Sequence, residues 1–119
     1  MITKIKPIIA SFIVVTIAVP SFALTQNEKG KMYFAGMCTA VADEGNKMLR
    51  AKGKTSNFII IWNAAENDVR YVRNKPGAVT AYNGMYDATL AGMKDYTIET
   101  KTSVIMMMLA ECAKMYKVQ

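Results

Sequence analysis

The chain contains two cysteines, Cys38 and Cys112, which lie far apart in the sequence and close to the two ends of its folding domain. A disulfide between them would close a loop over most of that domain, which the chain-entropy model values at about 4 to 5 kcal/mol. The alternatives are two free buried thiols and a metal site. Zinc prefers four ligands, and the chain offers two sulfurs and no histidine. The cysteine count therefore favours one disulfide that ties the end of the domain to its beginning.

The N-terminus has the three parts of a secretory signal peptide. Two lysines lie near its start, the uncharged residues 8–19 form an apolar stretch, and small residues lead to a cleavage site at Ala23. We expect residues 1–23 to be a cleaved signal peptide and residues 24–119 to be a single mature domain. The apolar stretch is shorter than the roughly 20 residues that span a bilayer. The alternatives are a retained N-terminal anchor and a buried core helix.

The expected compartment supports the expected disulfide. The chain has no sequon for N-glycosylation, so an exported location indicates the bacterial periplasm, with no membrane association after signal cleavage. Disulfides persist in oxidising compartments, whereas the cytosol keeps thiols reduced. Compartment and cysteine count thus lead to the same bridge.

Apolar residues recur every three or four positions in four segments, which predicts an all-α fold, a small four-helix bundle. Thr25 and Glu28 form a capping-box pair before the first helix, and Gly53 is a stop after it. The other helices are expected over about 57–73 after a cap at Thr55 or Ser56, over about 78–93, and from a start between Thr97 and Thr102. A strand over the run NFIIIWN is the main alternative, because isoleucine also favours strands.

Each predicted helix has an apolar stripe that should face the core. The two cysteines lie on the stripes of the first and last helices, so the disulfide should join these helices. The stripes are Phe34, Met37, Cys38, Val41, Gly45, Met48 and Leu49, then Phe58, Ile61, Trp62, Ala65, Val69 and Val72, then Val79, Tyr82, Tyr86, Leu90 and Met93, then Ile105, Met108, Leu109, Cys112 and Tyr116.

The sequence does not suggest catalysis. Without histidine there is no Ser/His or Cys/His pair and no histidine metal site. The closest carboxylate pairs, Glu66 with Asp68 and Asp43 with Glu44, lie on polar helix faces and are typical of solvated surface charge. Phosphate-binding glycine loops are absent. We therefore expect no enzyme activity, no cofactor and no metal.

Basic residues outnumber acidic ones, with a net charge of +6 for the whole chain and +4 after signal removal. They fall at predicted helix ends and in loops, where cations complement the helix dipole. The first basic group, at 47–54, has no aromatic residues among its cations, so nucleic-acid binding is not expected. The excess of basic residues is better suited to binding an acidic protein surface.

Apolar residues outside the core stripes indicate a protein-binding surface. On the second helix, a face roughly opposite the stripe carries Ile60, Ala64, Asn67 and Tyr71. Arg70 and Arg73 would contact the rim of an acidic partner. On the fourth helix, Met106 and Met107 also leave the stripe. Exposed apolar residues of this kind mark an interface with another protein. A homodimer would use the same surface. The alternative is that these two helices are buried on two sides within the bundle.

The stretches around the cysteines, YFAGMCTAVA and MLAECAKMYK, resemble the periplasmic immunity proteins that neutralise type VI secretion amidases. The match is carried by Cys38, Cys112, Met115 and Tyr116 and does not extend to the middle of the chain. The resemblance implies an exported helical domain with one disulfide that dimerises and blocks the catalytic cleft of a peptidoglycan amidase. It identifies no inhibitory residue. The alternative is a periplasmic chaperone or stress protein, although acid-activated chaperones depend on more carboxylates than this chain has.

Overall fold

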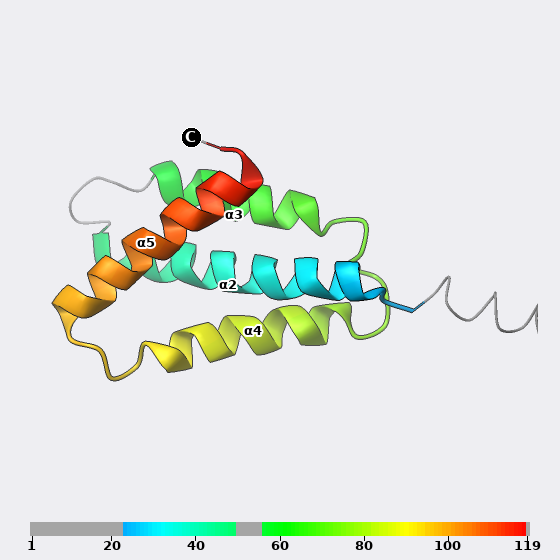
Figure 1. The fold of residues 1–119 in the computed structure, drawn as a ribbon, viewed down its shortest axis with the longest axis horizontal. Helices are drawn as coiled ribbons and strands as arrows, with labels where there is room; N and C mark the ends of the chain where they lie inside the picture. The colour runs from blue at the N-terminus through cyan, green and yellow to red at the C-terminus, as the bar shows by residue number, and fades with distance from the viewer. Residues whose placement is uncertain (1–22, 50–55, 119) are drawn as a thin grey trace, which may run out of the picture.

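The computed structural model describes residues 23–49 and 56–118. Within these residues the protein has four α-helices and no strand, so the predicted all-α fold is confirmed (Figure 1). The run of isoleucines lies in a helix, and the strand alternative is wrong. Three predicted features lie outside the described residues. They are the signal peptide up to residue 22, the helix stop at Gly53 and the helix cap at Thr55. The helices are α2 (Gln26–Leu49), α3 (Ser56–Asp68), α4 (Ala78–Gly92) and α5 (Ile98–Tyr116).

Helix α2 is the centre of the bundle. It packs against α3, α4 and α5, and α3 also packs against α5. In Figure 1, α4 runs along one side of α2 in the same direction, whereas α3 and α5 cover the other side and run in the opposite direction. Because three helices cover it, α2 buries residues around most of its circumference, including Met32, Ala40 and Val41.

A glycine allows α2 and α4 to approach closely. A Cβ atom on Gly36 would overlap the carbonyl oxygen of Tyr82 and lie 3.2 Å from the backbone nitrogen of Tyr86. Both obstacles are backbone atoms of α4, which cannot rotate away as a side chain can. The parallel packing of these two helices therefore depends on the missing side chain at Gly36.

The helix ends are set by local hydrogen bonds. Thr25 and Glu28 form the predicted capping box, in which the Glu28 N–H donates to Thr25 Oγ1 (3.1 Å) and the Thr25 N–H donates to Glu28 Oε1 (3.0 Å). Thr97 caps α5 by accepting from the Thr100 N–H at 3.2 Å, so α5 begins within the predicted window. Lys117, in the left-handed conformation, ends α5.

The disulfide between Cys38 and Cys112 is present and joins α2 to α5, the first and last of the described helices, as predicted. Its two Cα atoms are 6.0 Å apart, and both residues are completely buried. The bridge belongs to an apolar core to which all four described helices contribute. The buried members of this core include Met32, Val41, Phe58, Ile61, Val69, Val72, Met93, Ile105 and Leu109.

Helix α3 is shorter than predicted. It ends at Asp68 instead of Arg73, and the following backbone forms i to i−3 bonds, such as Val72 N–H to Val69 O at 3.0 Å. Asn67 and Asp68 favour this ending, because their short polar side chains compete for backbone hydrogen bonds. Val69 and Val72 remain buried, so the chain turns towards α4 without losing its apolar contacts.

Two residues predicted for the core lie at its edge. Trp62 in α3 exposes 39% of its surface, and Val79 in α4 exposes about half. Both lie at the edge of the apolar stripe of their helix. The remaining stripe residues are buried or partly buried.

Candidate functional site

The exposed side of α3 carries apolar and amide side chains. Ile59 and Ile60 expose 56% and 40% of their surfaces, Trp62 is also exposed, and Asn63 and Asn67 complete the surface. None of these five residues is charged, although a solvated helix face normally carries charged side chains. We call them, Ile59, Ile60, Trp62, Asn63 and Asn67, the α3 outer face.

Of the four residues predicted to form a binding row on the second helix, two belong to this face, and the other two, Ala64 and Tyr71, do not. Ile60 and Asn67 lie about two helical turns apart and are exposed, as expected for residues that meet another molecule. Ala64 lies between them in sequence but is partly buried. The predicted row of residues is therefore interrupted near its middle.

Tyr71 is exposed but lies in the turn after α3. Its exposed fraction is 64%, and its hydroxyl oxygen accepts a hydrogen bond from Lys31 Nζ of α2 at 2.9 Å. The same ammonium lies 5.5 Å from the centre of the Tyr71 ring. Because α3 ends at Asp68, Tyr71 does not continue the face that includes Ile60, and the structure places it beside the start of α2 instead.

The two predicted rim arginines already have partners within the chain. Arg70 donates to Asn67 Oδ1 at 2.7 Å. Arg73 forms an ion pair with Glu66, whose other carboxylate oxygen lies 2.7 Å from the hydroxyl of Tyr82. The hydrogen bond of Arg70 is exposed to solvent, so a partner protein can reach this side chain. Arg73, by contrast, belongs to a network with Glu66 and Tyr82 that links α3 to α4.

Sequence reasoning missed Ile59 and Trp62 as surface residues. A signal for Ile59 was present, because three consecutive isoleucines in a helix point in directions about 100° apart and cannot all face one core. Ile61 is the buried member of the run, and Ile59 and Ile60 point outward. No sequence signal places Trp62 at the edge of the core, because its position depends on how α3 packs against α2.

An open cavity of about 170 Å³ lies beside the α3 outer face, between α2 and α3. Its lining combines apolar residues with two polar ones from α2. Phe58 and Ala42 are buried at its base, and Ile59 and Trp62 border it on the exposed side. The lining residues are Ala42, Asp43, Asn46, Phe58, Ile59 and Trp62.

The carboxylate of Asp43 is held in place by a tyrosine of α4. Tyr86 donates its hydroxyl hydrogen to Asp43 Oδ2 at 2.6 Å. Burial and the neighbouring Asp43 carboxylate raise the pKa of Tyr86 to about 12. Tyr86 consequently keeps its hydrogen at neutral pH and remains a donor to Asp43.

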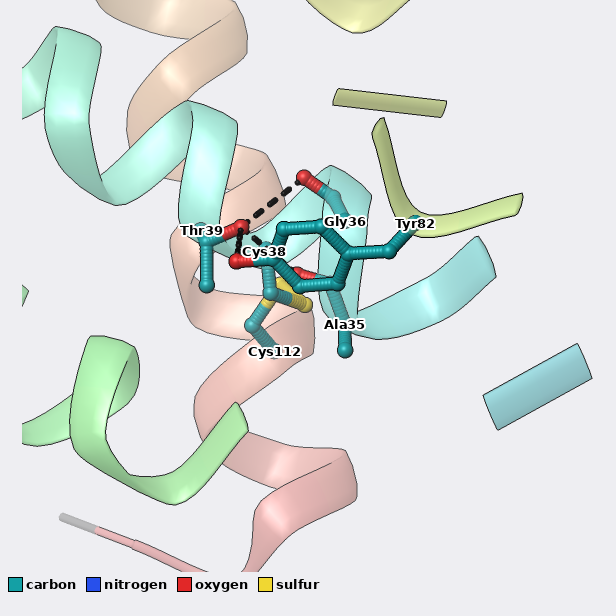
Figure 2. Close-up of a disulfide and its surroundings, with 6 residues drawn as sticks. All are labelled: Ala35, Gly36, Cys38, Thr39, Tyr82 and Cys112. Carbon is teal, nitrogen blue, oxygen red and sulfur yellow. Dashed lines mark hydrogen bonds between the residues drawn. A yellow bond between two sulfur atoms is a disulfide. The ribbon is translucent and has the colours of Figure 1, made fainter. Parts of the chain in front are cut away.

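A buried polar cluster lies next to the disulfide (Figure 2). The hydroxyl of Thr39 donates to the carbonyl oxygen of Ala35 (2.9 Å) and lies 3.1 Å from that of Gly36. Tyr82 Oη lies 2.7 Å from Thr39 Oγ1, and burial raises the pKa of Tyr82. Since Thr39 is fully buried and Tyr82 stays protonated, neither hydroxyl is placed to act as a nucleophile. The cluster instead fixes α4 on α2.

A second group of exposed apolar residues lies on α5. Met106 and Met107, which leave the predicted core stripe, expose about half or more of their surfaces. Methionine side chains adapt their shape to different partners. These two residues form a surface on a different helix from the α3 outer face.

Within residues 23–49 and 56–118, no group of three or more carboxylate or cysteine side chains is arranged to hold a metal ion. None of the helices in the same residues is long and apolar enough to cross a membrane.

Comparisons of the chain with protein-family models, with curated proteins and with solved structures find no match.

Proposed function

We propose that this protein acts by noncovalent binding to another protein, through the α3 outer face. The observation that carries the proposal is an uncharged, partly apolar helix face beside an open cavity, on a chain with 20% charged residues. Exposed apolar patches on a small domain mark interaction surfaces. Tryptophan is among the residues that contribute most to binding energy, and Trp62 lies at the edge of both the face and the cavity.

We further propose that the partner is an exported enzyme or toxin and that binding inhibits it. The proposal places the mature domain in the periplasm after removal of residues 1–23. The resemblance around Cys38 and Cys112 supports a cell-wall amidase as the target. A surface that is held by a buried disulfide and by helix packing is preorganised, which lowers the entropic cost of binding one specific partner.

A periplasmic chaperone is the second candidate. The exposed Met106 and Met107 of α5 favour it, because flexible thioether side chains suit surfaces that accept many partners. A chaperone of this kind would bind unfolded chains without fixed stoichiometry. The two candidates therefore differ in the number of partners and in the surface that binds them.

Affinity capture from periplasmic extract separates the two functions. The oxidised protein should retain one partner at fixed stoichiometry, identified by mass spectrometry, and should inhibit the activity of that partner in a purified assay. The double variant Ile59→Asp/Ile60→Asp should lose the partner, whereas the matched variant Met106→Asp/Met107→Asp should keep it. A broad set of unfolded clients that depends on the two methionines would replace the inhibitor proposal with the chaperone.

The gene neighbourhood offers a second test. An immunity protein should be encoded beside an exported toxin or amidase, and that neighbour should be the captured partner. A captured partner that is encoded elsewhere and is not inhibited would contradict the inhibitory role while leaving protein binding in place.

A further inference from the structure

We propose that the cavity between α2 and α3 recognises an arginine side chain of the protein partner. This inference rests on the proposed function and names the group that would anchor the partner beside the α3 outer face. Three features of the cavity carry it: apolar lining side chains, the exposed indole ring of Trp62, and the carboxylate of Asp43, which has no cation partner in the described part of the chain.

The size of the cavity suits one side chain. A cavity of about 150 Å³ accommodates a group the size of benzene, and binding sites for whole small molecules usually exceed about 300 Å³. At about 170 Å³, this cavity can hold the end of one long side chain. Phe58, Ile59 and Trp62 would contact the aliphatic stem of that side chain.

The charge of the cavity favours a cation. Asp43 uses Oδ2 to accept from Tyr86, and Oδ1 has no partner of its own among the described side chains. Lys47, one turn further along α2, is exposed and forms no ion pair with Asp43. By contrast, the carboxylates of Glu28, Glu44 and Glu66 all pair with a lysine or an arginine. Asp43 is thus a partly buried carboxylate that accepts a hydrogen bond from Tyr86 and has no cation partner among residues 23–49 and 56–118.

The chemistry of the lining residues favours arginine over lysine. The guanidinium group has several donors in a planar fork, so it can bond Asp43 and the side-chain oxygen of Asn46 together. It also stacks on aromatic rings, and the Trp62 indole is exposed at the border of the cavity. The ammonium group of lysine is a strongly hydrated point charge. It has no planar fork of donors for the two oxygens and no planar group that stacks on the indole ring.

Trp62 is the only tryptophan in the chain, so its fluorescence reports on this cavity. The probe is N-acetyl-arginine amide, titrated into the oxidised full-length domain at constant ionic strength. N-acetyl-citrulline amide is the control, since it has nearly the same shape and no charge. We expect a saturable change with a Kd of about 1 mM for the arginine probe, which is usual for a ligand of this size. The citrulline probe should bind at least about tenfold more weakly.

Two matched variants locate the binding. Asp43→Asn keeps an acceptor for Tyr86 but removes the charge, and should weaken the arginine probe about tenfold. Asp87→Asn removes an exposed carboxylate of α4 and should leave the titration unchanged. Equal binding of both probes, an unchanged titration for Asp43→Asn, or no saturable change up to about 50 mM would each overturn the proposal.

The outcome for this inference is separable from that for the proposed function. If the wild-type protein captures a partner and Asp43→Asn captures it equally well, the arginine inference is wrong and protein binding stands. If the arginine probe binds but no partner is captured, the cavity recognises a cation and the proposed function is wrong.

Discussion

Replacement of Gly36 by alanine tests the packing that places α4 on α2. The new Cβ would overlap the Tyr82 carbonyl oxygen, so α4 has to move away from α2. Gly30 lies on the same helix with open space around its Cβ position and is the matched control. Both changes raise helix propensity by the same amount, about 1 kcal/mol. The difference between the two variants therefore measures the steric effect alone.

The expected magnitude follows from the contacts at stake. Overpacking of a well-packed contact costs about 1 to 3 kcal/mol. Movement of α4 also strains the hydrogen bonds of Tyr82 to Thr39 and of Tyr86 to Asp43, each worth about 1 kcal/mol. After the gain in helix propensity, Gly36→Ala should lower the free energy of unfolding by about 2 to 4 kcal/mol. In a domain of this size, that corresponds to a melting temperature about 10 to 20 °C lower.

Thermal and urea unfolding, followed by circular dichroism, provide the assay. Gly30→Ala should raise the melting temperature by about 4 to 8 °C, because its only effect is on helix propensity. Gly36→Ala should fall well below the wild type under the same conditions. If the two variants have the same stability, α2 and α4 do not approach each other as closely as the structure shows, and the packing argument is refuted.

Three further predictions concern the disulfide, the N-terminus and the tyrosines. Alkylation of the exported protein without reductant should label no thiol, and reduction should lower the free energy of unfolding by about 4 kcal/mol; two labelled thiols would contradict the bridge. N-terminal sequencing should find a start at Leu24, and a start at Met1 in the membrane fraction would count against the signal peptide. Burial raises three tyrosine pKa values in the folded state, so stability present below about pH 10 should be lost as pH rises to about 12 and beyond. Ultraviolet absorbance should then show these tyrosines ionising only as the protein unfolds, and full ionisation of the folded protein would contradict their burial. They are Tyr82, Tyr86 and Tyr116.

Much of the fold could be predicted because the signals are local. Apolar spacing gives the helices, and the Thr25 and Glu28 pair marks the start of α2, where the structure places the capping box. Two cysteines on apolar stripes identify the bridge between α2 and α5. The predicted end of α3 is wrong. The apolar spacing continues through Val69 and Val72, although the backbone changes to i to i−3 hydrogen bonds after Asp68.

The candidate site was harder to predict because it depends on tertiary packing. The exposed side of Ile60 follows from helical periodicity alone. The exposure of Trp62 and the cavity beside it depend on the distance between α2 and α3, which no local pattern specifies. A continuous helix over 57–73 predicts that Tyr71 shares a face with Ile60, but the helix ends at Asp68 and Tyr71 contacts Lys31 from the following turn.

The central claim is that the α3 outer face binds a protein partner. Its most direct test is the affinity of the captured partner for the wild type and for the two double variants, measured by calorimetry. Ile59→Asp/Ile60→Asp should weaken binding by about 100-fold or more, as loss of central apolar contacts does at other interfaces, while helical circular dichroism stays the same. Met106→Asp/Met107→Asp should bind as the wild type does. Unchanged affinity of a folded α3 variant would contradict the claim, and loss of binding only in the α5 variant would move the site to Met106 and Met107.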